Sequence, residues 1–86
     1  MGSYRIAIKK SAAKEIERIE KKDRIRIIEK IRSLANDPRQ LGSKKLAGQE
    51  RYRVRQGKYR ILYQIIDDEL IINIVKVGHR RDVYKN

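Results

Sequence analysis

The 86-residue chain has no cysteine, tryptophan or phenylalanine, and it has one histidine and one proline. Without cysteine it forms neither a disulfide framework nor a thiolate zinc site, and it has no cysteine nucleophile. A single histidine also excludes a histidine-rich metal site. No apolar run is long enough to cross a bilayer, and no charged and apolar leader opens the chain. We therefore expect no membrane contact, no secretory signal and a cytoplasmic location.

Aliphatic residues and positive charge are abundant. Isoleucine, leucine and valine supply 23 of the 86 residues, enough for one core, so residues 1–86 are expected to form a single domain. Lysine and arginine number 23 against 11 acidic residues, a net charge of +12. Such a charge favours binding to polyanions such as nucleic acids. Half of it lies in residues 44–64, where seven basic residues accompany one acid, Glu50.

The first half of the chain reads as a strand followed by two helices. Alternating apolar residues predict a strand over 4–8. Ser11 is a candidate N-cap for a helix over 12–22, and Asp23 for a second helix. Pro38 follows that second helix and prevents its continuation. Apolar residues recur at helical spacing in both, so we expect a helical hairpin with one apolar face.

The second half reads as three strands, over 51–56, 59–66 and 70–77. Gly57-Lys58 separates the first two, and a two-residue loop with glycine first is typical of a type II′ hairpin. Counting outward gives the register Gln56 with Tyr59, Arg55 with Arg60, Val54 with Ile61, Arg53 with Leu62 and Tyr52 with Tyr63.

The next turn, at 67–70, sets Ile66 opposite Ile71 and brings residue 78 near Tyr59. One face of this sheet is then apolar and packs on the helices, and it collects Tyr52, Val54, Ile61, Tyr63, Ile65, Leu70, Ile72 and Ile74. The expected fold is α+β, with an N-terminal strand and a helical hairpin packed on one face of a small antiparallel β-sheet.

Three arginines converge on the opposite face. Arg55 lies opposite Arg60 in this register, Arg53 lies two residues along, and residues 51–66 contain no acid. Like charges in opposed positions destabilise a hairpin, so stability does not explain the cluster. Either the side chains splay apart in water with weak coupling, or they form a phosphate site, since guanidinium forks match phosphate oxygens.

The end of the chain adds three polar candidates, His79, Arg80 and Tyr84. The register brings this segment to the end of the sheet that holds Arg60. Arg80 offers another cation for phosphate, and Tyr84 a phenol that can stack on a base or transfer a proton. His79 has the one side chain with an ordinary pKa near 7, although a lone surface histidine is commonly a bystander.

Four segments taken together are specific: Lys45-Leu46 to Gly48, Tyr52-Arg53-Val54-Arg55, Gly57-Lys58-Tyr59-Arg60-Ile61-Leu62-Tyr63, and Val77-Gly78-His79-Arg80-Arg81-Asp82-Val83-Tyr84. Over nearly the whole chain they resemble the RelE/ParE superfamily of toxins from type II toxin–antitoxin systems, in its RelE-like branch. The resemblance implies a ribosome-dependent endoribonuclease that cuts mRNA in the decoding site. It implies as partners a RelB-like antitoxin, the ribosome and mRNA, with operator DNA reached only through the antitoxin complex, and neither cofactor nor metal.

Carried over by position, the resemblance and the face count give the catalytic candidates Arg53, Arg55, Arg60, Arg80, Tyr84 and His79. The implied reaction is attack of the ribose 2′-hydroxyl on the adjacent phosphate. In it Arg60 stabilises the phosphorane, Arg80 acts at the leaving side, and Tyr84 orients the bases. Candidates for binding RNA and the ribosome are Lys44, Lys45, Arg51, Lys58 and Arg81.

One departure from the family pattern affects the base. The best-known pattern has lysines at the positions of Arg53 and Arg55, one of them a proposed general base, and arginine does not give up its proton. Proton removal then falls to His79, Tyr84, water or ribosomal RNA, or the rate comes chiefly from charge stabilisation and positioning.

Two other functions fit the same fold. A ParE-like toxin inhibits DNA gyrase without nuclease activity, and it has no chemical need for the arginine set. A catalytically degenerate member would bind RNA with a steep salt dependence and leave it intact.

Overall fold

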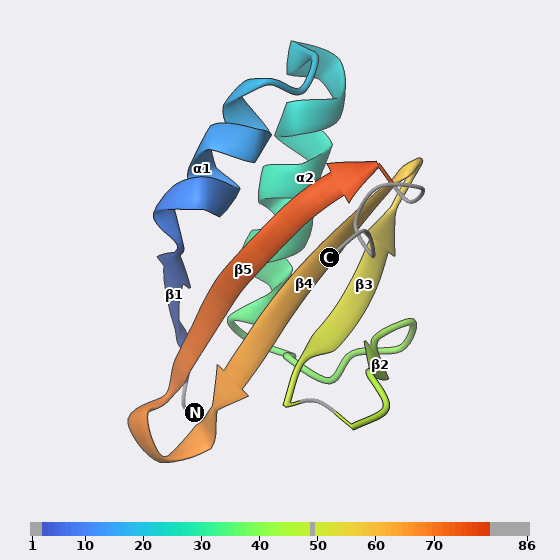
Figure 1. The fold of residues 1–86 in the computed structure, drawn as a ribbon. Coiled ribbons are helices and arrows are strands. Elements are labelled where there is room, and N and C mark those ends of the chain that lie inside the picture. The colour runs from blue at the N-terminus through green and yellow to red at the C-terminus, as the bar shows by residue number, and fades with distance from the viewer. Residues whose placement is uncertain (1–2, 49, 80–86) are drawn as a thin grey trace.

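The computed structural model of the chain describes residues 3–48 and 50–79 (Figure 1). In chain order the elements are β1 Arg5–Ile8, α1 Lys10–Glu17, α2 Lys21–Leu34, β2 Lys44–Lys45, β3 Tyr52–Gln56, β4 Tyr59–Ile66, the 3-10 turn η1 Asp67–Glu69, and β5 Ile71–His79. Both helices lie on one face of a five-stranded sheet with the order β1-β5-β4-β3-β2. The expected α+β class and the helical hairpin are confirmed.

The sheet is mixed, because β1 runs parallel to β5 while the other neighbours are antiparallel. Two backbone contacts hold the ends of β1 in place. The Tyr4 N–H donates to the Ala35 carbonyl at 2.8 Å, and the Lys9 N–H donates to the Ile74 carbonyl at 2.9 Å. The two-residue strand β2 is an element that the sequence pattern did not predict.

The hairpin between β3 and β4 has the predicted register at all five pairs, including Arg55 opposite Arg60. Gly57 has a φ of +60°, whereas Lys58 is not among the residues with positive φ. A positive φ at the first loop residue alone is the signature of the predicted type II′ turn.

A β-bulge in β5 shifts the register of the last strand by one residue. Ile66 lies opposite Ile71 as predicted, but Tyr63 pairs with Ile74 and Leu62 with Lys76, so that Val75 is extra. Gly78 therefore lies opposite Arg60 rather than near Tyr59, as the uninterrupted count had it. An inserted residue breaks strict alternation, and nothing in the local sequence marks it.

Both predicted N-caps are wrong. Lys9 caps α1 and Glu20 caps α2, neither through a side-chain hydrogen bond. Ser11 lies inside α1, and that helix ends at Glu17 instead of residue 22. Asp23 lies in the first turn of α2, where a negative charge favours the helix N-terminus.

Leu70 departs from the apolar face to which the strand count assigned it. It ends η1 in the left-handed conformation with a φ of +54°, and 44% of its surface is exposed. Its carbonyl instead accepts the Arg5 N–H at 2.7 Å, which ties the turn to β1.

The main core lies between the helices and the sheet. It comprises Ala12, Ile16, Ile19, Ile27, Ile31, Leu34, Val54, Ile61, Tyr63, Ile72, Ile74 and Val77. Tyr63 is fully buried and donates its hydroxyl to the Pro38 carbonyl at 2.6 Å, which satisfies the one polar atom of this large side chain. Within residues 3–48 and 50–79, neither helix is long and apolar enough to span a membrane.

Candidate functional site

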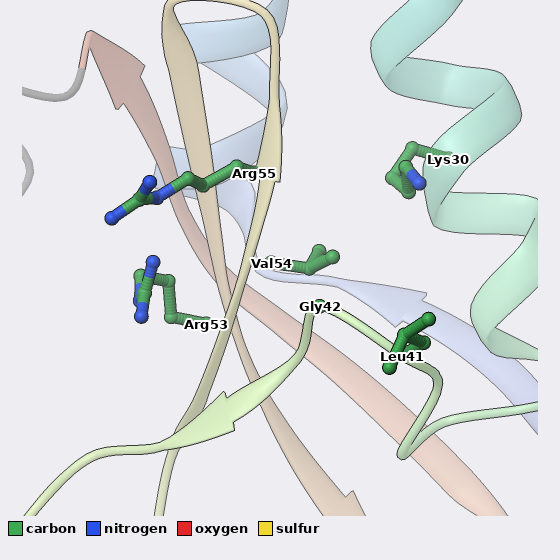
Figure 2. Close-up of a pocket in the computed structure, with 6 residues that line it drawn as sticks. All are labelled: Lys30, Leu41, Gly42, Arg53, Val54 and Arg55. Carbon is green, nitrogen blue, oxygen red and sulfur yellow. The ribbon is translucent and has the colours of Figure 1, made fainter.

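The face of the sheet turned away from the helices carries the three predicted strand arginines. Val54 and Ile61 are buried in the core, so alternation puts Arg53, Arg55 and Arg60 on the other face. Figure 2 shows the Arg53 and Arg55 side chains projecting from β3 to the same side, away from α2. Arg53 and Arg60 are half-buried and Arg55 is exposed, and the burial of Arg60 extends to the Nε atom of its guanidinium group. We call Arg53, Arg55 and Arg60 the arginine face.

Arg60 has an arginine as its neighbour on one adjacent strand and a glycine on the other. On one side it pairs with Arg55 of β3, and on the other with Gly78 of β5. Directly opposed side chains on one face are within about 5.5 Å at Cβ, so the two guanidinium groups can reach a single phosphate. Glycine adds no side chain to the face beside Arg60.

His79 is not brought to the arginine face. It pairs with Tyr59, and paired residues point to the same side of a sheet. Tyr59 packs against the main core, and its ring meets that of His79 edge-on with centroids 6.1 Å apart. His79 therefore lies on the helix side of the sheet, whereas Arg60 lies on the other side.

The two lysines of β2 also lie on opposite faces of the sheet. Lys44 pairs with Arg53 and so extends the arginine face across one more strand. Lys45 pairs with Tyr52, on the helix side, and its Nζ lies 3.7 Å from the Glu50 carboxylate. The structure thus brings only Lys44 of this pair to the face.

Of the other predicted RNA-binding residues, Arg51 is exposed just before β3 and Lys58 is exposed in the hairpin turn. The remaining three candidates, Arg80, Arg81 and Tyr84, lie outside the described residues.

A hollow of about 410 Å³ opens at the outer edge of β3. It is lined by Lys30, Leu41, Gly42, Arg53, Val54 and Arg55 (Figure 2). Sequence reasoning missed Lys30 and Leu41, because Lys30 reads as one more solvated cation on a helix and Leu41 as part of a loop. The packing of α2 against β3 brings Lys30 beside the arginines, and the loop that follows α2 brings Leu41 there.

Asp67, in η1, binds two separate segments at the opposite end of β3. Its carboxylate accepts hydrogen bonds from the Tyr4 hydroxyl at 2.6 Å and from Arg39 at 2.8 and 3.4 Å. Arg39 also donates to the Tyr52 hydroxyl at 3.3 Å. The hydrogen bonds from Arg39 and Tyr4 hold the pKa of Asp67 below its usual value.

Desolvation in the core raises the pKa of Tyr63, whose ring stacks on that of Tyr52.

The described part of the chain contains no group of three or more histidine, cysteine or acidic side chains placed to hold a metal ion. The arginine face itself supplies fixed cations, which can bind phosphate oxygens.

The family model for the ParE toxin of type II toxin–antitoxin systems matches residues 6–84. An Escherichia coli protein named as a RelE-like toxin is 31% identical over 86 residues, covering 94% of this chain and 90% of that protein. A Methanocaldococcus jannaschii protein named as toxin RelE1 is 31% identical over 87 residues, covering 96% and 97%.

Solved structures show the same fold. The toxin–antitoxin complex RelBE2 of Mycobacterium tuberculosis matches with a TM-score of 0.84 and 25% identity, over 95% of this chain and 97% of that one. The archaeal RelE–RelB complex of Pyrococcus horikoshii matches with a TM-score of 0.79 and 28% identity, over 91% and 96%. The chain belongs to the RelE/ParE superfamily of toxins from type II toxin–antitoxin systems, in its RelE-like branch.

Proposed function

We propose that this toxin is an endoribonuclease that cleaves mRNA in the ribosomal A site and so arrests translation and growth in the cytoplasm. The observation that carries the proposal is the Arg55–Arg60 pair, two opposed like charges beside the side-chain-free position of Gly78. Opposed guanidinium groups repel one another, and together they match the oxygens of a phosphate. The names of its relatives as RelE toxins support the same activity.

In the proposed reaction the ribose 2′-hydroxyl loses its proton and its oxygen forms a bond to the adjacent phosphorus. The bond from phosphorus to the 5′-oxygen breaks, and that oxygen takes up a proton. The products are a 2′,3′-cyclic phosphate and a free 5′-hydroxyl. Arg60 and Arg55 bear the extra negative charge of the phosphorane, and Arg53 binds the neighbouring backbone.

Three further candidate roles belong to this proposal. Arg80 acts at the leaving 5′-oxygen, Tyr84 orients the bases, and Lys44 beside Arg53 extends the cationic track. Arg51, Lys58 and Arg81 are proposed to bind RNA or the ribosome through phosphate contacts.

No arginine of the face serves as the base, because guanidinium stays protonated at working pH. His79 pairs on the helix side of the sheet with Tyr59. We therefore propose that the 2′ proton passes to water or ribosomal RNA, or to Tyr84, and that charge stabilisation and positioning supply most of the rate.

The test is primer extension on an mRNA translated in a reconstituted system, beside the same mRNA without ribosomes. Cleavage within codons only when ribosomes are present supports the proposal. Arg60→Ala is expected to lower cleavage by about 10²–10³-fold, the effect of losing one charge-stabilising donor. Ile25→Ala is the control, since Ile25 is exposed on α2 and lies apart from the arginine face. Intact mRNA with folded wild-type protein would refute the proposal.

A second function has one specific observation in its favour, since the matching family model is that of the ParE toxins. In this alternative the toxin inhibits DNA gyrase and leaves RNA intact. A supercoiling assay with purified gyrase separates the two. Inhibition that survives Arg60→Ala, together with uncut mRNA, would favour the ParE-like action.

A further inference from the structure

We infer that the hollow at the outer edge of β3 is a docking site for an acidic segment of the cognate antitoxin, with an aliphatic side chain seated on Leu41. This inference rests on the proposed role as a toxin that an antitoxin neutralises. Related toxins have been solved in complex with their antitoxins, among them RelBE2 of Mycobacterium tuberculosis and RelE–RelB of Pyrococcus horikoshii.

Leu41 is the most exposed large apolar residue of the described chain. Its side chain is 102% exposed, whereas Ile8, Ile25 and Leu70 are 44–48% exposed. A leucine left wholly in water forgoes the free energy of burying its side chain, which contact with a partner's apolar side chain would recover. A single exposed leucine is unremarkable alone, but this one stands at the rim of the hollow.

The backbone holds Leu41 in this position. The Ser43 N–H donates to the Gln40 carbonyl at 2.9 Å and closes a four-residue turn, with Gly42 at a φ of +97° in its third position. This is the type II geometry, which glycine permits. The Gln40 amide also donates to the Ser33 hydroxyl at 3.1 Å and to the Asp37 carbonyl at 3.2 Å, so the turn is anchored to the end of α2.

The charged residues that line the hollow are Lys30, Arg53 and Arg55, and none of the lining residues within 3–48 and 50–79 is acidic. The surface is therefore electrostatically complementary to carboxylates. The Lys30 ammonium donates a long hydrogen bond of 3.4 Å to the Gln40 side chain, a weak contact that it can exchange for a carboxylate of a partner.

The hollow joins two sides of the sheet. In Figure 2 Lys30 and Leu41 stand on the side of α2, while Arg53 and Arg55 project to the other side. A segment seated against Leu41 would place carboxylates at Lys30 and then at the two arginines as it crosses the edge of β3. Occupation of the hollow would thus neutralise cations of the arginine face and exclude RNA.

A protein segment fits the hollow better than an RNA strand does. The phosphates of an RNA strand would satisfy the three cations, but its bases stack on aromatic side chains, and Leu41 is aliphatic. An acidic peptide with one aliphatic side chain satisfies both the charges and the leucine.

The experiment uses the full-length toxin and its full-length cognate antitoxin and measures the Kd of their complex by titration calorimetry. Leu41→Ser removes the apolar contact, and Lys30→Glu reverses the charge. Each is expected to weaken antitoxin binding at least about tenfold, with the combined variant weaker still. Ile25→Ser and Lys10→Glu are the matched controls, because both residues are exposed and lie away from the hollow.

Circular dichroism and thermal unfolding establish that each variant folds, and Lys30→Gln replaces Lys30→Glu if the latter does not. Translation arrest is measured in parallel without antitoxin, and it is expected to be unchanged in Leu41→Ser. If the wild-type toxin does not arrest translation, the proposed function is refuted, whatever the Kd values are.

Unchanged antitoxin affinity in Leu41→Ser and in the folded Lys30 variant, relative to the controls, would overturn the docking site. Weaker binding of single-stranded RNA in the Lys30 variant, with unchanged antitoxin affinity, would overturn it in favour of an RNA path across the edge of β3. Equal losses in the variants and their controls would also overturn it, because they would reflect net charge or solubility rather than the hollow.

Discussion

Arg39 and Asp67 form a two-point contact between the loop that follows α2 and the turn that precedes β5, at 2.8 and 3.4 Å. Tyr4 joins it from the start of the chain by donating its hydroxyl to Asp67 at 2.6 Å. The guanidinium of Arg39 also lies 5.6 Å from the centre of the Tyr52 ring. One carboxylate therefore connects three segments that are far apart in the sequence.

The first prediction is that Asp67→Asn lowers the melting temperature at neutral pH but not in acid. The pKa of Asp67 lies below its ordinary 3.8 in the folded protein, owing to Arg39 and Tyr4. Its contribution to stability is present above the unfolded pKa and is lost as pH falls through the folded pKa. The melting temperatures of the wild type and the variant should therefore converge as the pH is lowered from about 5 to 2.

Thermal unfolding followed by circular dichroism at several pH values tests this. Asp68→Asn is the control, because Asp68 is an exposed acid in the same turn. A difference between wild type and Asp67→Asn that persists unchanged into acid would contradict the prediction.

A second prediction concerns Glu15 of α1, which binds the end of β5. Its carboxylate accepts the Val77 N–H at 2.9 Å and pairs with the Lys76 ammonium at 2.8 Å. Beyond Ile74 this edge of β5 is no longer paired with β1, so Glu15 satisfies a strand edge that the sheet leaves open. Glu15→Gln is expected to cost about 1 kcal/mol, since the Val77 acceptor remains while the charge is lost.

Urea unfolding measures this loss, with Glu17→Gln as control on the same helix. Glu17 is exposed and in the last turn of α1. Equal stability of the two variants would show that the Glu15 contacts contribute nothing beyond a surface charge.

Much of this fold could be predicted because the β3–β4 hairpin is determined locally. Gly57 fixes the turn, the turn fixes the register, and the register places Arg55 opposite Arg60. The bulge at Val75 could not be predicted in this way, since it depends on how β5 packs against both β4 and α1. Alternation beyond it shifts by one residue, which moves Gly78 beside Arg60.

The hollow at β3 was unpredictable for a related reason. Lys30 and Leu41 come from a helix and a loop whose distance from β3 is set by long-range packing. Their residue types carry no local signal, because a basic residue on a charged helix and one leucine in a loop are both ordinary.

A third prediction separates stability from activity at the arginine face. Arg55→Glu replaces two opposed like charges by an opposed pair with Arg60, and it is expected to stabilise the hairpin by about 0.2–1 kcal/mol. The same substitution removes a phosphate-binding cation, and the new carboxylate pairs with the Arg60 guanidinium and competes with the phosphate for it. Cleavage of mRNA should therefore fall by about 10²-fold or more. Urea unfolding and primer extension are measured on one preparation, with Arg55→Lys as the variant that keeps the charge. A variant that is both less stable and inactive would argue for a structural role of Arg55 instead.

The last prediction follows from the side of the sheet on which His79 lies. Directly paired residues share a face, and His79 pairs with Tyr59 against the core rather than with Arg60. Loss of a general base costs about 10²–10⁴-fold, so His79→Gln should leave ribosome-dependent cleavage within about threefold of the wild type. The pH dependence of its cleavage rate should also run parallel to that of the wild type, because His79 takes no part in the proton transfer. Primer extension at several pH values gives both quantities, and Tyr59→Phe controls for the loss of packing around the ring. A drop of 10²-fold with a changed pH profile, and no such drop in Tyr59→Phe, would instead assign His79 the proton transfer and require the end of β5 to turn toward Arg60 on the ribosome.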